Sequence, residues 1–195
     1  MAGSKTTSKR RRRNLPPAGL LLTPGASADR NHSTLVALEE GLPELAVERL
    51  TLGTTSIKRA VTKVRESAES LAERLDVSPE RIAYGGRSFG GRACSVAVAE
   101  GLPAAALVLL SYPLHPPGKP DNLRVEHFGA IAVPTLFLSG VKDPFGSADE
   151  FAAHTGAIES EVTMAWVPGN HAPKGQDETI VAEVRSFLGL PTNQG

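Results

Sequence analysis

The sequence has little cysteine, few aromatic residues and no long hydrophobic run. Its one cysteine, Cys94, excludes an intramolecular disulfide and gives no sign of an oxidising compartment. No apolar stretch approaches the ~20 residues that a bilayer-spanning helix needs, so no membrane association is expected. Aromatic residues make up 5% and hydrophobic residues 41% of the 195 positions, which predicts one domain with a core of Leu, Val and Ala.

Acidic residues are absent from the first thirteen positions, which hold six of the 21 Lys and Arg residues. The other 15 basic residues stand against all 21 acidic ones, so the rest of the chain carries a formal charge of −6. Because phosphate binding needs clustered cations on the fold itself, the folded part is not expected to bind nucleic acid. We predict a disordered, solvated basic tail over residues 1–14, with a nucleic-acid or anionic-membrane anchor as the alternative, and one folded domain over 15–195.

A signal peptide is not expected at the basic start of the chain. The arginine run and the leucines at 20–22 resemble one superficially, but Pro16 and Pro17 interrupt the segment. Its apolar part is also shorter than the ~7 to 15 residues of a signal-peptide core. A cytoplasmic location is therefore predicted.

Short apolar runs alternate with helical patterns along the rest of the chain. Strands are predicted over residues 19–23, 46–52, 81–84, 105–111, 135–139 and 161–167. Helices are predicted over residues 33–40, 57–75, 89–100, 148–157 and 177–188. This alternation is typical of a doubly wound, mostly parallel sheet of about six strands in an α/β domain.

Residues 82–92 carry a GxSxG motif between a predicted strand and a helix of small residues. Gly86 and Gly90 flank Ser88 at the spacing of a nucleophile elbow, the strained turn that lifts a serine above the edge of a sheet. A five-residue match also arises by chance in glycine-rich turns, so the motif alone leaves the function open. A serine hydroxyl needs a base within hydrogen-bond reach and a carboxylate that orients this base.

Asp143 and His171 are the candidates for the carboxylate and the base. In enzymes with such an elbow, the chain order is serine, acid, histidine, each after a strand. Asp143 follows the predicted strand over 135–139, and His171 follows that over 161–167, just before the final helix. The other four histidines fit less well and are expected to be surface or structural residues: His32, His115, His127 and His154.

Two backbone amides are candidates for an oxyanion hole, which stabilises the negative charge of an acyl-transfer intermediate. One belongs to Phe89, the residue after the candidate nucleophile, and the other should come from the loop after the first strand. In that loop Pro24 has no N–H and Gly25 permits a sharp turn, so Ala26 is the expected donor. An ordinary Pro-Gly turn is the alternative interpretation of this loop.

The segment over 111–120, Ser-Tyr-Pro-Leu-His-Pro-Pro-Gly-Lys-Pro, is too unusual to arise by chance. Together with residues 85–92, residues 143–146 and the Pro-Gly-Ala loop, it closely resembles a family of small α/β hydrolases. That family is named for a testis-expressed protein and for a regulatory subunit of the non-specific lethal histone acetyltransferase complex, and it includes many bacterial predicted hydrolases. The resemblance spans residues 20–171 and concerns motifs specific to this family rather than to the fold.

The resemblance implies a reduced α/β-hydrolase fold without a lid. It also implies a catalytic triad of Ser88, Asp143 and His171, with Ala26 and Phe89 as the oxyanion donors. No stretch of the chain is long enough for a lid domain, so the pocket should be open and shallow.

The resemblance further makes the segment from Tyr112 to Lys119 a pocket wall. Tyr112, His115 and Lys119 are then expected to meet the substrate, with ordinary proline-rich loop structure as the alternative. Two places depart from the family pattern: residues 50–55 replace an aromatic, arginine-containing stretch, and Asn170 stands where an aspartate is usual.

The sequence therefore predicts a serine hydrolase that cleaves a small ester or thioester through an acyl-enzyme. The alternative is a non-catalytic interaction scaffold that keeps the hydrolase fold and uses the basic tail. A flavodoxin-like cofactor binder is disfavoured, because the loop over 23–27 lacks a GxGxxG pattern. No cofactor and no metal ion is predicted, since the histidines are scattered, and the oligomeric state stays open.

Overall fold

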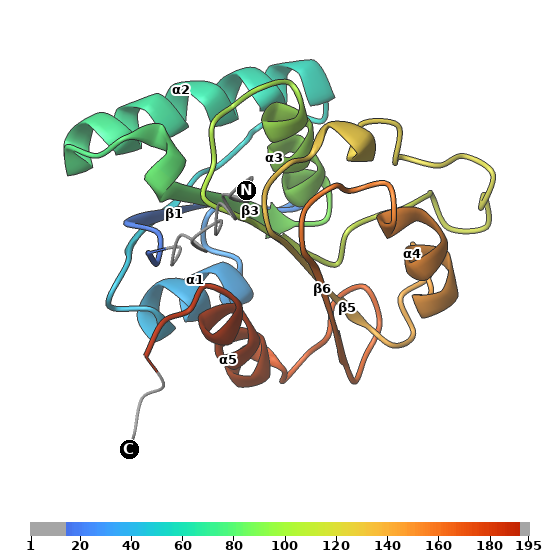
Figure 1. The fold of residues 1–195 in the computed structure, drawn as a ribbon. Helices are drawn as coiled ribbons and strands as arrows, with labels where there is room; N and C mark the ends of the chain where they lie inside the picture. The colour runs from blue at the N-terminus through green and yellow to red at the C-terminus, as the bar shows by residue number, and fades with distance from the viewer. Residues whose placement is uncertain (1–14, 192–195) are drawn as a thin grey trace, which may run out of the picture.

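Six parallel strands form one sheet, and α-helices cover both of its faces (Figure 1). The computed structural model describes residues 15–191, so the predicted basic tail over 1–14 lies outside the described residues. The strands are β1 (Gly19–Thr23), β2 (Ala46–Arg49), β3 (Ile82–Arg87), β4 (Leu107–Leu110), β5 (Thr135–Gly140) and β6 (Val162–Val167). The helices are α1 (Ser33–Gly41), α2 (Ile57–Leu75), α3 (Phe89–Ala99), α4 (Ala148–Thr155) and α5 (Asp177–Phe187), with 3-10 turns η1 (Pro79–Arg81) and η2 (Phe128–Ala130).

The strand order is β2-β1-β3-β4-β5-β6, and every neighbouring pair is parallel. The chain moves outward in one direction from β1 to β2 and then in the other direction from β3 to β6. The order therefore reverses between β1 and β3, and ligands of such sheets bind outside the carboxyl ends of the strands at this reversal. The predicted doubly wound fold is confirmed.

Each face of the sheet has its own core, because successive side chains of a strand point to opposite faces. Leu21, Tyr84 and Phe137 belong to the core under α2, α3 and α4. Leu22 and Leu138 belong to the core under α1 and α5, which pack side by side below the sheet in Figure 1. Burial of both faces explains why the strands are almost continuously apolar rather than alternating.

Helix α2 forms as its sequence pattern predicts. Its buried residues recur at helical spacing on one side and pack on the sheet and α3: Ala60, Val61, Val64, Ala68, Leu71 and Ala72. The Ser56 side chain caps the first turn by accepting a hydrogen bond from the Arg59 amide at 3.5 Å. Asp76 ends the helix in a left-handed conformation and donates its N–H to the last turn.

Five strands differ in extent from their predicted bounds, β5 and β6 by one residue each and β2, β3 and β4 by more. Strand β3 runs on to Arg87 because Gly85 and Gly86 pair with β4, where a Cβ on Gly85 would lie 2.3 Å from the Val108 carbonyl. Strand β4 ends before Ser111, whose φ of 47° leaves the extended region. Strand β2 ends at Arg49, ahead of the turn at Gly53, which has a φ of 60°.

Within residues 15–191, no helix is both long enough and apolar enough to span a bilayer.

Cys94 lies on α3 with no exposed surface and contacts Thr23 Oγ1 at 3.4 Å and the Gly85 carbonyl at 3.3 Å. Burial raises the pKa of this thiol to about 12. At pH 8 only about one thiol in 10⁴ is then ionised, so we expect iodoacetamide to leave the native protein unmodified. The same reagent should add one group per chain in guanidinium chloride, as measured by intact mass. Stoichiometric labelling under native conditions would contradict this packing.

His127 gives the fold a sensitivity to acid. Its Nε2 lies 2.8 Å from Ser95 Oγ, and burial lowers the pKa of its imidazole to about 4. The unfolded chain takes up this proton near pH 6.5, so the free energy of unfolding should fall as the pH drops from about 6.5 to about 4. Urea titrations across this pH range should show a smaller loss of unfolding free energy for His127→Gln, whose amide can still reach Ser95. An identical slope in both proteins would refute the assignment.

Candidate active site

Ser88 joins the last residue of β3 to the first residue of α3, at the carboxyl edge of the sheet. Its φ of 51° and ψ of −118° lie outside the common regions for a non-glycine residue, which costs about 1–3 kcal/mol. Two backbone hydrogen bonds hold the turn: the Ser88 N–H donates to the Leu110 carbonyl at 2.8 Å, and the Ser88 carbonyl accepts from the Arg92 N–H at 3.0 Å. The hydroxyl is thereby presented on a sharp strand-to-helix turn.

Gly86 and Gly90 leave the space that this turn requires. A Cβ on Gly86 would lie 2.2 Å from the Thr23 carbonyl oxygen, and its φ of 156° also disfavours other residues. A Cβ on Gly90 would lie 2.3 Å from the Pro24 carbonyl oxygen. The end of β1 and the residue after it therefore lie in close contact with Gly86, ahead of Ser88, and with Gly90, after it. The spacing of the GxSxG motif follows from these two contacts.

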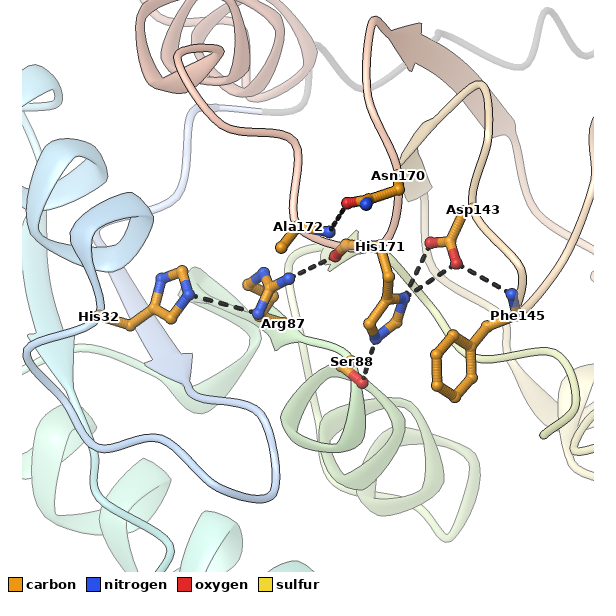
Figure 2. Close-up of polar contacts among 8 residues, drawn as sticks. All are labelled: His32, Arg87, Ser88, Asp143, Phe145, Asn170, His171 and Ala172. Carbon is orange, nitrogen blue, oxygen red and sulfur yellow. Dashed lines mark hydrogen bonds and ion pairs between the residues drawn. The ribbon is translucent and has the colours of Figure 1, made fainter. Parts of the chain in front are cut away.

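His171 lies between Ser88 and Asp143 in the loop that follows β6 (Figure 2). Its Nε2 is 2.8 Å from Ser88 Oγ, and its Nδ1 is 2.9 Å from Asp143 Oδ2. A carboxylate can only accept here, so Nδ1 carries the proton and Nε2 is left to accept from the serine hydroxyl. The structure thus brings together the three residues that the sequence proposes as nucleophile, acid and base.

The Asp143 turn holds the carboxylate directed at His171. The Asp143 side chain is 1% exposed, and its Oδ1 accepts the Phe145 amide N–H at 2.9 Å. The Phe145 ring stacks on the His171 ring, with 4.0 Å between the ring centres and an angle of 29° between the planes. The imidazole is therefore held by a hydrogen bond at one edge and by an aromatic ring on one face.

Arg87, the residue between Gly86 and Ser88, supports the His171 loop on the side away from Phe145 (Figure 2). Its Nη2 donates to the His171 carbonyl oxygen, and its Nη1 lies 3.3 Å from His32 Nε2. Burial and the nearby Arg87 charge lower the pKa of His32, which favours the neutral imidazole. Sequence reasoning did not find this contact, because nothing in the motif shows which way an arginine at this position points.

Asn170 keeps the turn before His171 in shape without a carboxylate. Its Oδ1 accepts the Ala172 amide N–H at 3.0 Å. An aspartate at this position could accept the same hydrogen bond. The departure from the family pattern at Asn170 therefore leaves the local turn intact.

The loop after β1 passes directly beside Ser88. A Cβ on Gly25 would lie 3.8 Å from the Ser88 Cβ, so the neighbouring Ala26 is close to the nucleophile turn. Phe89 is the first residue of α3 and has no acceptor one turn earlier. Within the described part of the chain, neither the Ala26 nor the Phe89 amide donates a hydrogen bond to a protein acceptor. Both amides are thus available to an incoming oxyanion.

Tyr112 and His115 do not lie open to a substrate, contrary to expectation. Tyr112 is fully buried, and its hydroxyl donates to the Arg124 carbonyl at 2.7 Å. His115 is 5% exposed and lies 3.1 Å from Glu150, while its backbone N–H donates to the Phe145 carbonyl. Through His115 the segment instead supports the Asp143 turn. Lys119 is exposed, and its contact with a substrate stays a prediction.

Among residues 15–191, no three His, Cys, Asp or Glu side chains gather as a metal ion would require.

Comparison with known proteins gives a match to the model of an alpha/beta hydrolase domain over residues 16–181. Solved structures with a similar fold include a dienelactone hydrolase from Anabaena variabilis, with a TM-score of 0.74, 19% identity, and coverage of 89% of this chain and 86% of that one. Est1E from Butyrivibrio proteoclasticus has a TM-score of 0.70, 18% identity, and coverage of 91% and 89%. The esterase Pf2001 from Pyrococcus furiosus has a TM-score of 0.71, 16% identity, and coverage of 89% and 81%.

The close approach at Gly90 should make this position intolerant of a methyl group. Gly90→Ala is favoured by helix propensity, but the added Cβ meets backbone, so we expect a net loss of about 1–3 kcal/mol in urea unfolding. Gly156→Ala is the matched control, since a Cβ there meets nothing within 4 Å and its φ is −60°. Equal stability of the two variants would argue against the packing described for the Ser88 turn.

Proposed function

The chain belongs to the alpha/beta hydrolase domain family, and on that basis we propose that it is a serine hydrolase that cleaves a small carboxylic ester or thioester. The observation that carries the proposal is the position of His171, whose two ring nitrogens lie 2.8 Å from Ser88 Oγ and 2.9 Å from Asp143 Oδ2. A neutral imidazole in this arrangement can accept the serine proton while the carboxylate stabilises the resulting cation.

In the first half of the reaction, Ser88 Oγ attacks the carbonyl carbon while its proton moves to His171 Nε2. The carbonyl oxygen becomes negatively charged and accepts hydrogen bonds from the Ala26 and Phe89 amides. When the intermediate collapses, the bond to the leaving oxygen or sulfur breaks, and that atom takes the proton from His171. An acyl group then remains on Ser88, and an alcohol or thiol is released.

In the second half, His171 Nε2 takes a proton from water, and the hydroxide oxygen attacks the acyl carbon. A second oxyanion forms at the same two amides, and its collapse returns the proton to Ser88 Oγ and releases the carboxylic acid. Asp143 and Arg87 act as positioning residues throughout: Asp143 holds the ring at Nδ1, and Arg87 holds the loop at the His171 carbonyl.

A small substrate suits the open surroundings of Ser88. The longest connection at the carboxyl edge of the described sheet, over residues 111–127, contains no helix or strand, and none of the connections forms a domain over the serine. Cavities of about 520 and 340 Å³ flank the site, the first beside Ala26 and the second beside Arg87 and Ala172. A long acyl chain would find little cover in such a site. These features support a small hydrolase of the kind that includes the testis-expressed proteins and their bacterial relatives.

The alternative of a non-catalytic scaffold is less well supported. A scaffold would gain nothing from holding Ser88 in a costly backbone conformation or from burying a carboxylate behind His171. Both features have a use when the serine is a nucleophile.

A fluorophosphonate probe tests the proposal directly, because it labels only an activated serine. We expect one adduct per chain by intact mass, no adduct on Ser88→Ala, and labelling of His171→Ala slowed by about 10³-fold or more. Ser186→Ala, which removes an exposed hydroxyl on α5, serves as the control and should react like the wild type. A folded wild-type protein that takes no probe, or an adduct that survives in Ser88→Ala, would refute the proposed function.

A further inference from the structure

A cavity of about 520 Å³ opens beside the oxyanion loop, between that loop and the start of α2. It lies along the connection from β2 to α2, over residues 50–56. The residues that line it come from the loop, from this connection and from the first two turns of α2: Ala26, Gly53, Thr54, Thr55, Arg59 and Lys63. The mechanism above uses only Ala26 of this set.

The cavity carries positive charge and no negative charge. Arg59 and Lys63 stand four residues apart, so they share one face of α2, and no acidic residue lines the space. Within the described residues neither side chain forms an ion pair, although five of the arginines do. Two uncompensated cations in one hollow favour an anionic ligand.

The backbone around the cavity adds to this preference. A Cβ on Gly53 would lie 3.8 Å from Lys63 Nζ, so the ammonium group of this exposed lysine extends over the connection. Helix α2 presents its amino end here, with no acidic residue in its first turn. The hydroxyls of Thr54 and Thr55 supply further polar groups at the wall. Together these groups can bind a carboxylate or a phosphate by charge and by hydrogen bonds.

The cavity adjoins the reacting centre through one short loop. Ala26 lines it, and the adjacent Gly25 lies against Ser88. The cavity and the reacting centre therefore share this loop as a common boundary.

We propose that this cavity binds an anionic group of the substrate, so that the preferred substrates are esters or thioesters that carry a carboxylate or a phosphate. The inference rests on the proposed hydrolase function and adds to it the charge class of the substrate. The anion would be held by Arg59 and Lys63, while the ester carbonyl lies at Ser88 and the two oxyanion amides.

Matched substrate pairs test this inference. Mono-para-nitrophenyl glutarate and para-nitrophenyl pentanoate have acyl chains of equal length, and only the first carries a carboxylate. Butyryl-coenzyme A and the butyryl thioester of N-acetylcysteamine have the same acyl group, and only the coenzyme A leaving group carries phosphates, together with its adenosine and pantoyl parts. We expect kcat/KM to be higher for the charged member of at least one pair, and the pair that responds identifies which side of the substrate carries the anion.

The double variant Arg59→Gln/Lys63→Gln removes both charges and keeps an unbranched polar side chain at each position. It should lower kcat/KM for the charged substrate by about 10- to 100-fold, the loss of one or two charge-assisted hydrogen bonds, and leave the neutral partner within about twofold. Lys58→Gln is the matched control, because it removes an exposed cation from the same turn outside this cavity. Added salt should reduce the preference in the wild type and not in the double variant.

The results distinguish a failure of the hydrolase function from a failure of the anion site. If the fluorophosphonate labels Ser88 but charged and neutral substrates are cleaved with equal kcat/KM, the anion site is refuted and the hydrolase function stands. Equal losses on charged and neutral substrates in the double variant refute the site as well. If the probe does not label Ser88, the hydrolase function is refuted. An NMR titration with glutarate then tests anion binding in the cavity alone. Shifts confined to residues 53–63 and lost in the double variant would support an anion site, and their absence would refute it.

Discussion

The close approach of β1 to the turn between β3 and α3 is the contact on which the site depends. The carbonyls of Thr23 and Pro24 lie where a side chain on Gly86 or Gly90 would be, so the two segments meet backbone to backbone. This contact confines Ser88 to a conformation that costs about 1–3 kcal/mol, and it brings the loop with Ala26 beside the hydroxyl. The proposed nucleophile and the two proposed oxyanion amides are thus positioned by one packing arrangement, at the point where the strand order reverses.

The order of the remaining strands positions the acid and the base. Asp143 and His171 follow β5 and β6, which lie side by side at one edge of the sheet, so their loops meet above it. Phe145 and Arg87 then restrain the histidine from opposite sides, one at the ring and the other at the backbone. Because Asp143 is shielded from water, its hydrogen bond to the imidazole is stronger than it would be at the surface. The site therefore combines a strained turn with a rigid histidine, and neither depends on a mobile cover.

Much of this arrangement could be predicted from the sequence, and the failures have physical causes. The strands and helices follow from local apolar patterns. The predicted end of β3 is too early because Gly85 and Gly86 resemble a turn until their pairing with β4 is known. The family resemblance of their segment predicts Tyr112 and His115 in a pocket wall. The aromatic ring instead fills the core against Phe128 and Phe137, and the histidine is bonded to Glu150. Residue type alone cannot tell a buried polar side chain from an exposed one.

The sequence by itself determined the elements, their order, the strained turn around Ser88 and the identity of the acid and base candidates, because each of these depends on neighbouring residues or on position along the chain. The tertiary structure decided which distant groups meet. Ser88 and His171 are 83 residues apart, and their hydrogen bond exists only once the strand order is set. The contact from Arg87 to the His171 carbonyl and the charged cavity beside Ala26 likewise depend on side-chain directions and on how closely α2 approaches the oxyanion loop. Such relations arise from packing between segments that have no local pattern in common, so only the folded chain reveals them.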